Sequence, residues 1–417
     1  MPDKTMARPG GPGALSHLRV LDLSRVLAGP WCSQNLADMG ADVIKVERPG
    51  AGDDTRGWGP PWVEGAQAGA GADSTYYAAA NRGKKSITVD ISRPEGQEMI
   101  RKLVAVSDVV IENYKVGDLK RYGLDYASLS GLNPRLVYCS ITGYGQEGPS
   151  AQKPGYDFVF QAMGGLMSIT GERDDLPGGG PQKAGIAIAD VMTGMYSTIA
   201  ILSALEHRSV SGRGQYIDMA LIDCIVALGG NQVTGYFASG KVPGRFGNAH
   251  ASLVPYQVFV VADGEMVVAV GNDGQWQQYC AAIERPDLAA DPRWIKVTGR
   301  ITGRQELVPE LARTMLTRTR AEWLERLEAG GVPCGPINDY RQVFEDPQVQ
   351  HRKLRVDLHR PDGSTVSTIA SPLRLQGTPP VYDRAPPTLG DATEDVLGGL
   401  LGLSGEEIAR HRANRII

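Results

Sequence analysis

Short apolar runs alternate with helix-length amphipathic stretches over the first third of the chain. The runs predict strands at 18–23, 41–46, 86–91, 108–112 and 136–141. The stretches between them predict helices at 29–39, 94–105 and 118–129. A strand, a helix and a further strand in succession form a parallel pair with a crossover connection. The chain is therefore predicted to build a doubly wound α/β sheet, with any site in the loops at the strand ends.

The loop after the first predicted strand argues against a dinucleotide cofactor. Arg25–Pro30 occupies this turn and lacks the G-x-G-x-x-G pattern that brings the backbone close to a pyrophosphate. A nicotinamide cofactor is therefore not expected.

A second style of sequence follows Gly212 and predicts a smaller domain. Apolar, β-rich runs at 258–262 and 266–270 flank Asp263-Gly264, which is a strong signal for an antiparallel hairpin. Residues 305–330 have the apolar spacing of amphipathic surface helices. The predicted organisation is a flexible tail at 1–16, a large domain at 17–206, a linker at 207–250, a small α+β domain at 251–330 and a return segment at 331–417 that completes the large domain.

Charge and composition exclude several classes of function. Lysine and arginine number 43 against 47 acidic residues, and the net charge of -4 provides no basic field for nucleic acid or a membrane surface. The five cysteines show no C-x-x-C spacing and the six histidines no H-x-x-x-H or H-E-x-x-H pairing, so neither a metal site nor a disulfide framework is expected. The longest apolar stretches, 191–205 and 224–240, are interrupted by polar residues, and no apolar signal run opens the chain. We therefore expect a cytoplasmic protein with no membrane partner.

The segment Ala184–Gly194 holds the most informative single residue. A short apolar run, predicted as a strand, ends in the lone carboxylate of Asp190, and a helical pattern then continues to Arg208. Aspartate is a preferred N-cap, which accounts for Asp190 without any chemistry. Alternatively, the positive end of the helix keeps the carboxylate ionised, as a carboxylate nucleophile requires. The position alone leaves both interpretations open.

Several segments in a fixed order give the chain a family resemblance. They lie at 21–30, 40–56, 81–86, 112–114, 143–145, 155–157, 184–194 and 331–338. Together they resemble the class III CoA-transferases, the carnitine and bile-acid type, from Leu18 to Ile417. The segments at 74–77, 138–145 and 250–256 are most similar to the subgroup that acts on succinate, hydroxymethylglutarate and related dicarboxylates.

This resemblance implies a fold, a reaction and a partner. The fold implied is a large Rossmann-like domain with a smaller α+β domain, in an interlocked homodimer. The reaction implied is CoA transfer from an acyl-CoA donor, succinyl-CoA, to a short dicarboxylic acid. Asp190 matches the family nucleophile, which passes through an aspartyl anhydride and an aspartyl-CoA thioester. The coenzyme A thioester is then a substrate, and no permanently bound cofactor is implied.

Further site residues follow from the resemblance. Arg48 and Arg121 match contacts to CoA phosphates, for which a guanidinium offers forked donors, although a loop arginine taken alone is also accounted for by solvation. The other CoA-contact candidates are Asn113, Tyr114, Val26, Val89 and Tyr156. Candidates on the substrate side are Asp157 as an assisting acid, His250 against the acyl group and Arg245 for the distal carboxylate of a dicarboxylate.

Three alternatives to CoA transfer remain. α-Methylacyl-CoA racemases have a His and Asp pair, but Tyr156 stands in the place of that histidine and tyrosine is a poor base near pH 7. A non-catalytic CoA-binding protein would need Asp190 to be only a cap. A thioesterase would need a nucleophile elbow, and the chain has no G-x-S-x-G segment.

Overall fold

The chain folds into two compact units, described here from a computed structural model for residues 13–63 and 73–417. The first unit contains the described residues up to Leu166, with Ala184–Phe237 and Gln350–Ile417. The second unit contains Met167–Lys183 and Ala238–Val349. The predicted tail lies mostly outside the described residues; of its last part, Leu15 donates a backbone hydrogen bond to Met39.

A parallel sheet forms the centre of the first unit, as the alternating pattern predicts, and it gains a sixth strand from the segment predicted as a linker. Its strand order is β3-β2-β1-β4-β5-β6, so the order reverses between β1 and β4. This is the order found in doubly wound α/β sheets. The strands are β1 (Arg19–Asp22), β2 (Asp42–Glu47), β3 (Lys84–Thr88), β4 (Val109–Glu112), β5 (Val137–Thr142) and β6 (Tyr216–Ala220).

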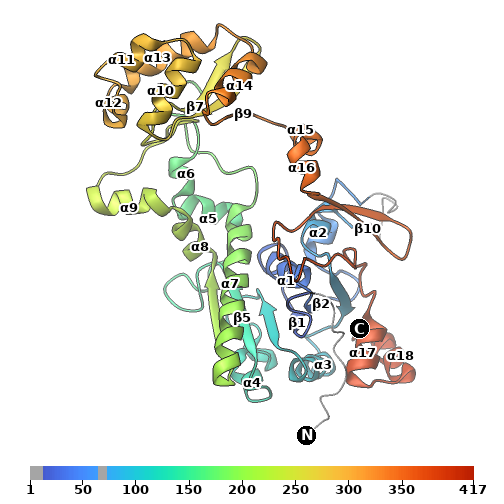
Figure 1. The fold of residues 1–417 in the computed structure, drawn as a ribbon. Helices are drawn as coiled ribbons and strands as arrows, with labels where there is room; N and C mark the ends of the chain where they lie inside the picture. Colours follow the sequence, from blue (N-terminus) through green and yellow to red (C-terminus); the bar gives the residue numbers. More distant parts are fainter. Residues whose placement is uncertain (1–12, 64–72) are drawn as a thin grey trace. The chain divides into compact units, whose positions relative to one another are not determined.

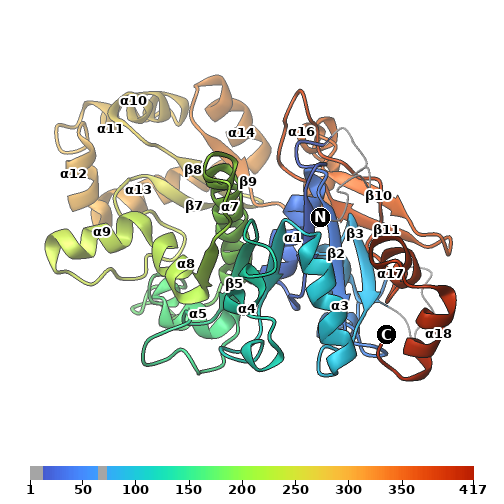
Figure 2. The same cartoon turned by 90° about the horizontal axis from the view of Figure 1, so that it is seen from below.

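Helices cover both faces of this sheet. Successive residues of β1 point to opposite faces, so Val20 and Leu21 belong to two different core clusters. One face packs against α1 (Ala28–Asp38) and α7 (Ile188–Ser211), the other against α3 (Pro94–Ala105) (Figure 2). Helices α1 and α7 approach so closely that a Cβ at Gly194 would lie 2.8 Å from the carbonyl oxygen of Ala28.

The end of the chain returns to the first unit and completes its core. Helices α17 (Thr393–Leu401) and α18 (Gly405–Ala413) lie beside α3, although more than half of the chain separates them from it in sequence (Figures 1 and 2). Leu397 and Ile416 are buried in the same cluster as Leu21 of the central strand. The return segment therefore supplies side chains that close one face of the sheet.

Helix α7 also passes a length-and-composition test for a membrane span. Among the residues described, it is the one helix long and apolar enough to cross a bilayer. Its buried residues, including Ala189, Ile201 and Ala204, join the core cluster that α1 and β5 share. A core helix gives the same signal, and this packing accounts for the buried side of α7, whereas Ile199 on the same helix is exposed.

Several predicted elements differ from those observed. In place of a helix at 118–129 there are a 3-10 turn, η2 (Lys120–Tyr122), and α4 (Tyr126–Ser130), because Gly123 between them is left-handed with φ 64°. The predicted linker at 207–250 contains the end of α7, β6 and further helices. The remaining elements of the first unit include η1 (Asp54–Gly57), α2 (Thr75–Ala79), α5 (Asp157–Met163), α8 (Leu221–Leu228), β10 (Arg355–His359) and β11 (Thr365–Ile369); α6 (Leu166–Ile169) and α9 (Gly230–Ser239) each end in the second unit.

The second unit is an α+β fold around three antiparallel strands. The predicted hairpin is present, with β7 (Tyr256–Val261) paired to β8 (Gly264–Ala269) and β8 to β9 (Cys334–Pro336). Trp276 and Trp323 are fully buried in its core. Its helices are α10 (Asp273–Ala282), α11 (Pro286–Ala290), α12 (Val297–Thr302), α13 (Arg304–Met315), α14 (Arg320–Ala329) and α15 (Tyr340–Glu345), and α16 (Pro347–His351) leads into the return segment.

Candidate active site

An open pocket lies at the carboxyl edge of the parallel sheet, where the loops after β1, β4 and β5 meet. Its volume is about 460 Å³, and its whole wall belongs to the first unit. Open α/β sheets bind ligands at this edge, beside the strand pair at which the order reverses. We call it the Asp190 pocket. The wall is formed by Arg25–Ala28, Asp54, Trp58, Asn113–Val116, Ile141–Gly143, Ala151–Tyr156, Asp190 and Leu221.

Asp190 lies in the first turn of α7, not at the end of a strand. The predicted strand at 184–189 is wrong, because α7 begins at Ile188 and residues 184–187 are irregular. Ile186 is 53% exposed, so the apolar residues of this segment do not mark a buried strand. Ala187, at the N-cap of α7, makes no side-chain cap hydrogen bond. Asp190 is therefore not the cap of its own helix.

The cap comes from Asp157, the first residue of α5. Its Oδ1 accepts hydrogen bonds from the backbone N–H of Ala189, at 2.7 Å, and of Asp190, at 3.3 Å. Such bonds satisfy donors that a helix start leaves unpaired. The structure thus brings the two predicted catalytic aspartates together, and their roles in catalysis remain predictions.

The Asp190 carboxyl group is not held fully ionised by the helix end. Burial, and then the negative charge of Asp157, raise the pKa of Asp190 to about 7. This direction is opposite to the expectation from the helix dipole, because the cost of removing the carboxylate from water is the larger effect. Near neutral pH the group is poised between its two forms, a condition typical of functional sites.

Tyr76 lies beside the pocket wall, and the sequence reasoning did not single it out. Its ring stands edge-on to that of Trp58, with centroids 5.2 Å apart, and Trp58 lines the Asp190 pocket. Burial, followed by the charges of Asp190, Asp157 and Asp53, raises the pKa of Tyr76 to about 12. The neutral phenol therefore lies within the electrostatic reach of the nucleophile candidate. The signal in the sequence is weak, since Tyr77 beside it is buried in the core.

Three of the predicted CoA-contact residues line the pocket in the loops after β1 and β4. The Asn113 amide accepts from the backbone N–H of Arg25 at 2.9 Å and donates to its carbonyl oxygen at 2.6 Å. Val26, with a left-handed φ of 70°, donates its N–H to the Asp53 carboxylate at 3.2 Å. Such a conformation is strained for a β-branched residue and persists only where its surroundings fix it. Tyr114 follows Asn113 in the wall.

The remaining CoA-contact candidates differ in exposure. Tyr156 is 68% exposed and lines the pocket, whereas Val89 is buried after β3. Arg48 and Arg121 are exposed cations outside the pocket wall. Arg48 lies 2.7 Å from Asp54, and the Arg121 guanidinium lies over the ring of Tyr122 at 4.6 Å. Both arginines can reach an anion in solvent, and their contacts to CoA phosphates stay predictions.

His250 and Arg245 belong to the second unit, and the structure gives each a local structural contact. The His250 Nδ1 accepts a hydrogen bond from the Ser252 N–H at 3.0 Å. The Arg245 side chain is 12% exposed and pairs with Asp174, while its other nitrogens donate to the carbonyls of Ser168 and Glu172. These contacts join two loops, so a role for Arg245 toward a substrate carboxylate remains a prediction.

Buried ion pairs lie beneath the loops of the pocket wall. No pattern in the sequence predicts which charged residues form these pairs. The ammonium of Lys45 in β2 lies 2.9 Å from the Asp53 carboxylate, and both side chains are fully buried. Lys84 of β3 pairs with Asp22 of β1 at 3.2 Å, also without exposure. Asp53 is the same residue that fixes Val26. The charges therefore order the loops that carry the pocket wall.

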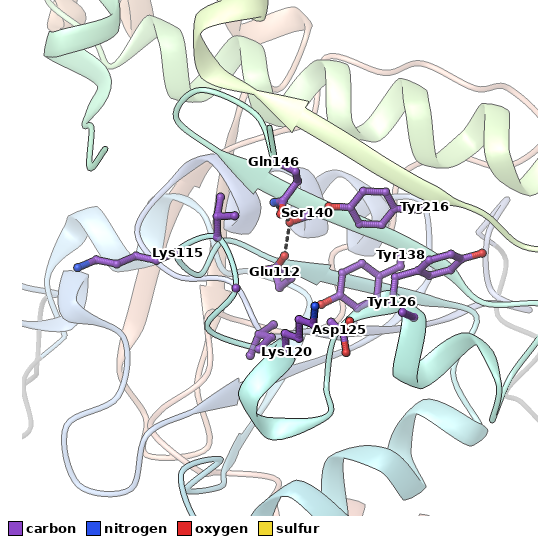
Figure 3. Close-up of a pocket in the computed structure, with 13 residues that line it drawn as sticks. Glu112, Lys115, Lys120, Asp125, Tyr126, Tyr138, Ser140, Gln146 and Tyr216 are labelled. Atoms are coloured by element: carbon purple, nitrogen blue, oxygen red, sulfur yellow. Dashed lines mark hydrogen bonds between the residues drawn. The ribbon is translucent and has the colours of Figure 1, made fainter. Parts of the chain in front are cut away.

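A second pocket, of about 430 Å³, lies beside the first and shares Lys115 and Val116 with it. We call it the Glu112 pocket. Figure 3 shows the Glu112 carboxylate facing Ser140, which donates a short hydrogen bond to it, while Gln146 donates to Ser140 at 2.7 Å. The structure shows no salt bridge to Glu112 within the described residues. Burial raises the pKa of Glu112 to about 7, despite the hydrogen bonds it accepts.

The stability of Glu112→Gln is expected to increase relative to that of wild type as the pH rises. The folded state holds the proton more tightly than the unfolded chain, so wild-type stability falls between the unfolded pKa of 4.5 and about 7. At pH 8 this loss is about 3 kcal/mol, a loss that Glu112→Gln avoids. Urea unfolding of both proteins at pH 5 and pH 8 measures the difference. Glu98→Gln, at an exposed helix position, is the control; a pH-independent difference for Glu112→Gln contradicts the prediction.

The first unit thus combines a parallel sheet with an aspartate at its carboxyl edge, and comparison with known families identifies the class of protein to which it belongs. The sequence model of CoA-transferase family III matches residues 15–393, and the chain belongs to this family. It is a class III CoA-transferase, and the predicted resemblance is confirmed.

Individual relatives are similar over nearly the whole chain. The succinate–glutarate CoA-transferase of Agrobacterium fabrum is 49% identical over 386 residues, which cover 93% of this chain and 95% of that protein. The human succinyl-CoA:glutarate CoA-transferase is 41% identical over 387 residues, covering 93% and 86%. A CAIB/BAIF family protein from Brucella suis, solved by crystallography, has a TM-score of 0.81 and 45% identity, covering 93% and 99%.

Proposed function

We propose that this enzyme transfers CoA from succinyl-CoA to a short dicarboxylic acid, with glutarate as the first acceptor to test. The observation that carries the proposal is Asp190, which lines an open pocket at the carboxyl edge of the sheet with a pKa raised to about 7. Two relatives that are 49% and 41% identical are named for succinate or succinyl-CoA and for glutarate.

The proposed reaction uses the Asp190 carboxylate as a covalent carrier. It attacks the succinyl thioester, which forms a mixed anhydride and releases CoA thiolate. The thiolate attacks the aspartyl carbonyl, giving an aspartyl-CoA thioester and free succinate. The acceptor carboxylate then repeats the two steps in reverse, leaves as its CoA thioester and restores Asp190. Each step exchanges one activated acyl bond for another, so exclusion of water preserves the activation.

The chain's own residues support these steps in distinct ways. Backbone N–H groups of the loops around the pocket are donors for the oxyanions that develop on the carbonyl carbons. The ring of Trp58 forms part of the pocket wall, and the neutral phenol of Tyr76 packs edge-on against that ring. We propose that the Rossmann-like sheet edge holds CoA through the loop residues Val26, Asn113, Tyr114 and Tyr156, with Arg48 and Arg121 toward its phosphates. Homodimerisation, which sedimentation equilibrium tests, and a cytoplasmic location stay predictions.

A screen of acceptors with succinyl-CoA tests the proposal. We expect glutarate and other short dicarboxylates to give their CoA thioesters at rates at least about tenfold above acetate, because a site that pairs a second carboxylate rejects an acid without one. Liquid chromatography with mass detection measures the products. Succinate labelled with heavy carbon provides a control, since exchange into succinyl-CoA needs only the donor half-reaction. Transfer to monocarboxylates alone contradicts the acceptor class, and absence of label exchange contradicts the donor.

A further inference from the structure

Gln161 on α5 makes an unusual set of contacts beside the nucleophile segment. Its side chain is fully buried. The Nε2 atom donates to Asp157 Oδ2 at 2.6 Å and to the carbonyl oxygen of Ile186 at 3.3 Å, and Oε1 accepts from the Ala184 N–H at 2.8 Å. One amide therefore joins Asp157 to the irregular segment that leads into α7.

The two carboxylate oxygens of Asp157 accept hydrogen bonds from different groups. Oδ2 accepts from Gln161, whereas Oδ1 accepts from the backbone N–H groups of Ala189 and Asp190. Rotation of the Asp157 carboxylate would break both sets together. A continuous chain of hydrogen bonds thus runs from the Gln161 amide, through Asp157, to the backbone of Asp190.

We propose that Gln161 is a positioning residue for CoA transfer, which holds the Asp157 carboxylate in the orientation that fixes the first turn of α7 and so places Asp190. The inference rests on the proposed function of Asp190. Gln161 does not line the Asp190 pocket, so its effect is transmitted through Asp157. A displacement of about 1 Å at a reacting group lowers a rate by as much as about 100-fold, which sets the scale of the expected loss.

Glutamate is the informative replacement, because it keeps the shape of Gln161 and removes only the donor. The introduced carboxylate would still accept from Ala184, but it would face Asp157 with a second negative charge one helical turn away. Two carboxylates in contact, one of them at a fully buried position, favour a shared proton. Protonation of Asp190 lowers the activity of both enzymes as the pH falls from about 8 to about 6. The shared proton partly restores the contact in Gln161→Glu, so the ratio of its activity to that of wild type is expected to rise over the same range.

The test combines kinetics with a measurement that does not depend on activity. We expect Gln161→Glu to lower kcat for succinyl-CoA-dependent transfer at pH 8 by about 10- to 100-fold and to change the Kd for free CoA by less than about threefold. Hydrogen–deuterium exchange of a peptide spanning 184–194 is expected to be at least about tenfold faster. Gln97→Glu, at a half-buried position of α3 with a single bond to a backbone carbonyl, is the matched control.

A double variant tests whether the hydrogen bond, not the glutamine, matters. In Asp157→Asn with Gln161→Glu, donor and acceptor exchange places: the new amide donates to the new carboxylate while its oxygen still caps α7. A kcat of the double variant at least about tenfold above that of Gln161→Glu alone supports the proposal. A folded Gln161→Glu enzyme with wild-type kcat and exchange overturns it, as does a double variant in which exchange over 184–194 stays as fast as in Gln161→Glu. If wild type transfers no CoA while the exchange effect holds, the proposed function fails and Gln161 still orders α7.

Discussion

Asp190→Asn is expected to lower CoA transfer by about 10⁴-fold or more, the scale seen when a covalent nucleophile is removed from other enzymes. The amide has nearly the size of the carboxylate but is not nucleophilic, so neither the anhydride nor the aspartyl thioester can form. Its backbone bond to Asp157 does not involve the changed group and is expected to persist. Initial rates with succinyl-CoA and glutarate measure the loss.

Two further measurements make this result specific. Asp223→Asn, at an exposed position on α8, makes the same chemical change outside the pocket and is expected to leave the rate within about twofold. Mass spectrometry of wild-type enzyme mixed with succinyl-CoA is expected to find the adduct on the peptide that contains Asp190. A folded Asp190→Asn enzyme that transfers CoA at the wild-type rate contradicts the assignment of the nucleophile.

The raised pKa of Asp190 adds a pH dependence to the same prediction. Only the carboxylate attacks the thioester, and burial together with Asp157 raises its pKa to about 7. The rate of the first half-reaction is therefore expected to fall below pH 7 and to approach about a tenfold loss per unit. A rate that is flat from pH 5 to pH 8 would show that the ionised form is held by a contact formed with the substrate.

Five strands of the parallel sheet are predicted from the sequence, because apolar residues recur with a different spacing in strands and in amphipathic helices. It also singles out Asp190, Asp157 and the Asn113 loop, which the structure brings to one edge of that sheet. The predicted strand before Asp190 failed for a physical reason. Its apolar residues do not form a buried strand: Ile186, for example, is exposed in an irregular segment that Gln161 of α5 holds in place.

Contacts between segments that are far apart in the sequence could not be predicted. Nothing in the pattern around Asp190 shows that its helix is capped by a carboxylate 33 residues earlier. A charged residue inside a strand pattern is ordinarily assigned to a solvated face, yet Lys45 and Glu112 are both buried. Burial of a charge depends on a partner from another strand or loop, and that information appears only when the chain is folded.

Lys45→Met is expected to destabilise the fold by about 3–5 kcal/mol, the usual cost of removing one partner from a buried ion pair. Methionine fills a similar volume but leaves the Asp53 carboxylate without its ammonium, at a site where both side chains are fully buried. Burial alone would raise the pKa of Asp53, but Lys45 and the hydrogen bonds from Thr55 lower it to about 2. Urea unfolding at pH 7 measures the change.

The pH dependence identifies the ion pair as the cause of that loss. With its folded pKa below the unfolded value of 3.8, Asp53 stabilises wild type above that value and stops doing so as the pH falls through about 2. Without Lys45 the pKa of Asp53 rises. The difference in unfolding free energy between wild type and Lys45→Met is therefore expected to shrink as the pH falls. Lys102→Met, on the exposed side of α3, is expected to change stability by less than about 0.5 kcal/mol.

The same variant connects stability to the site, because Asp53 also accepts the N–H of the strained Val26 in the pocket wall. A carboxylate that becomes protonated or moves toward water releases this loop. Lys45→Met is therefore expected to weaken CoA binding at temperatures where it is still folded, by about tenfold, a scale set by the roughly 1–3 kcal/mol that holding one such strained backbone residue costs. Unchanged CoA affinity in a destabilised variant would separate the ion pair from the loop and contradict this coupling.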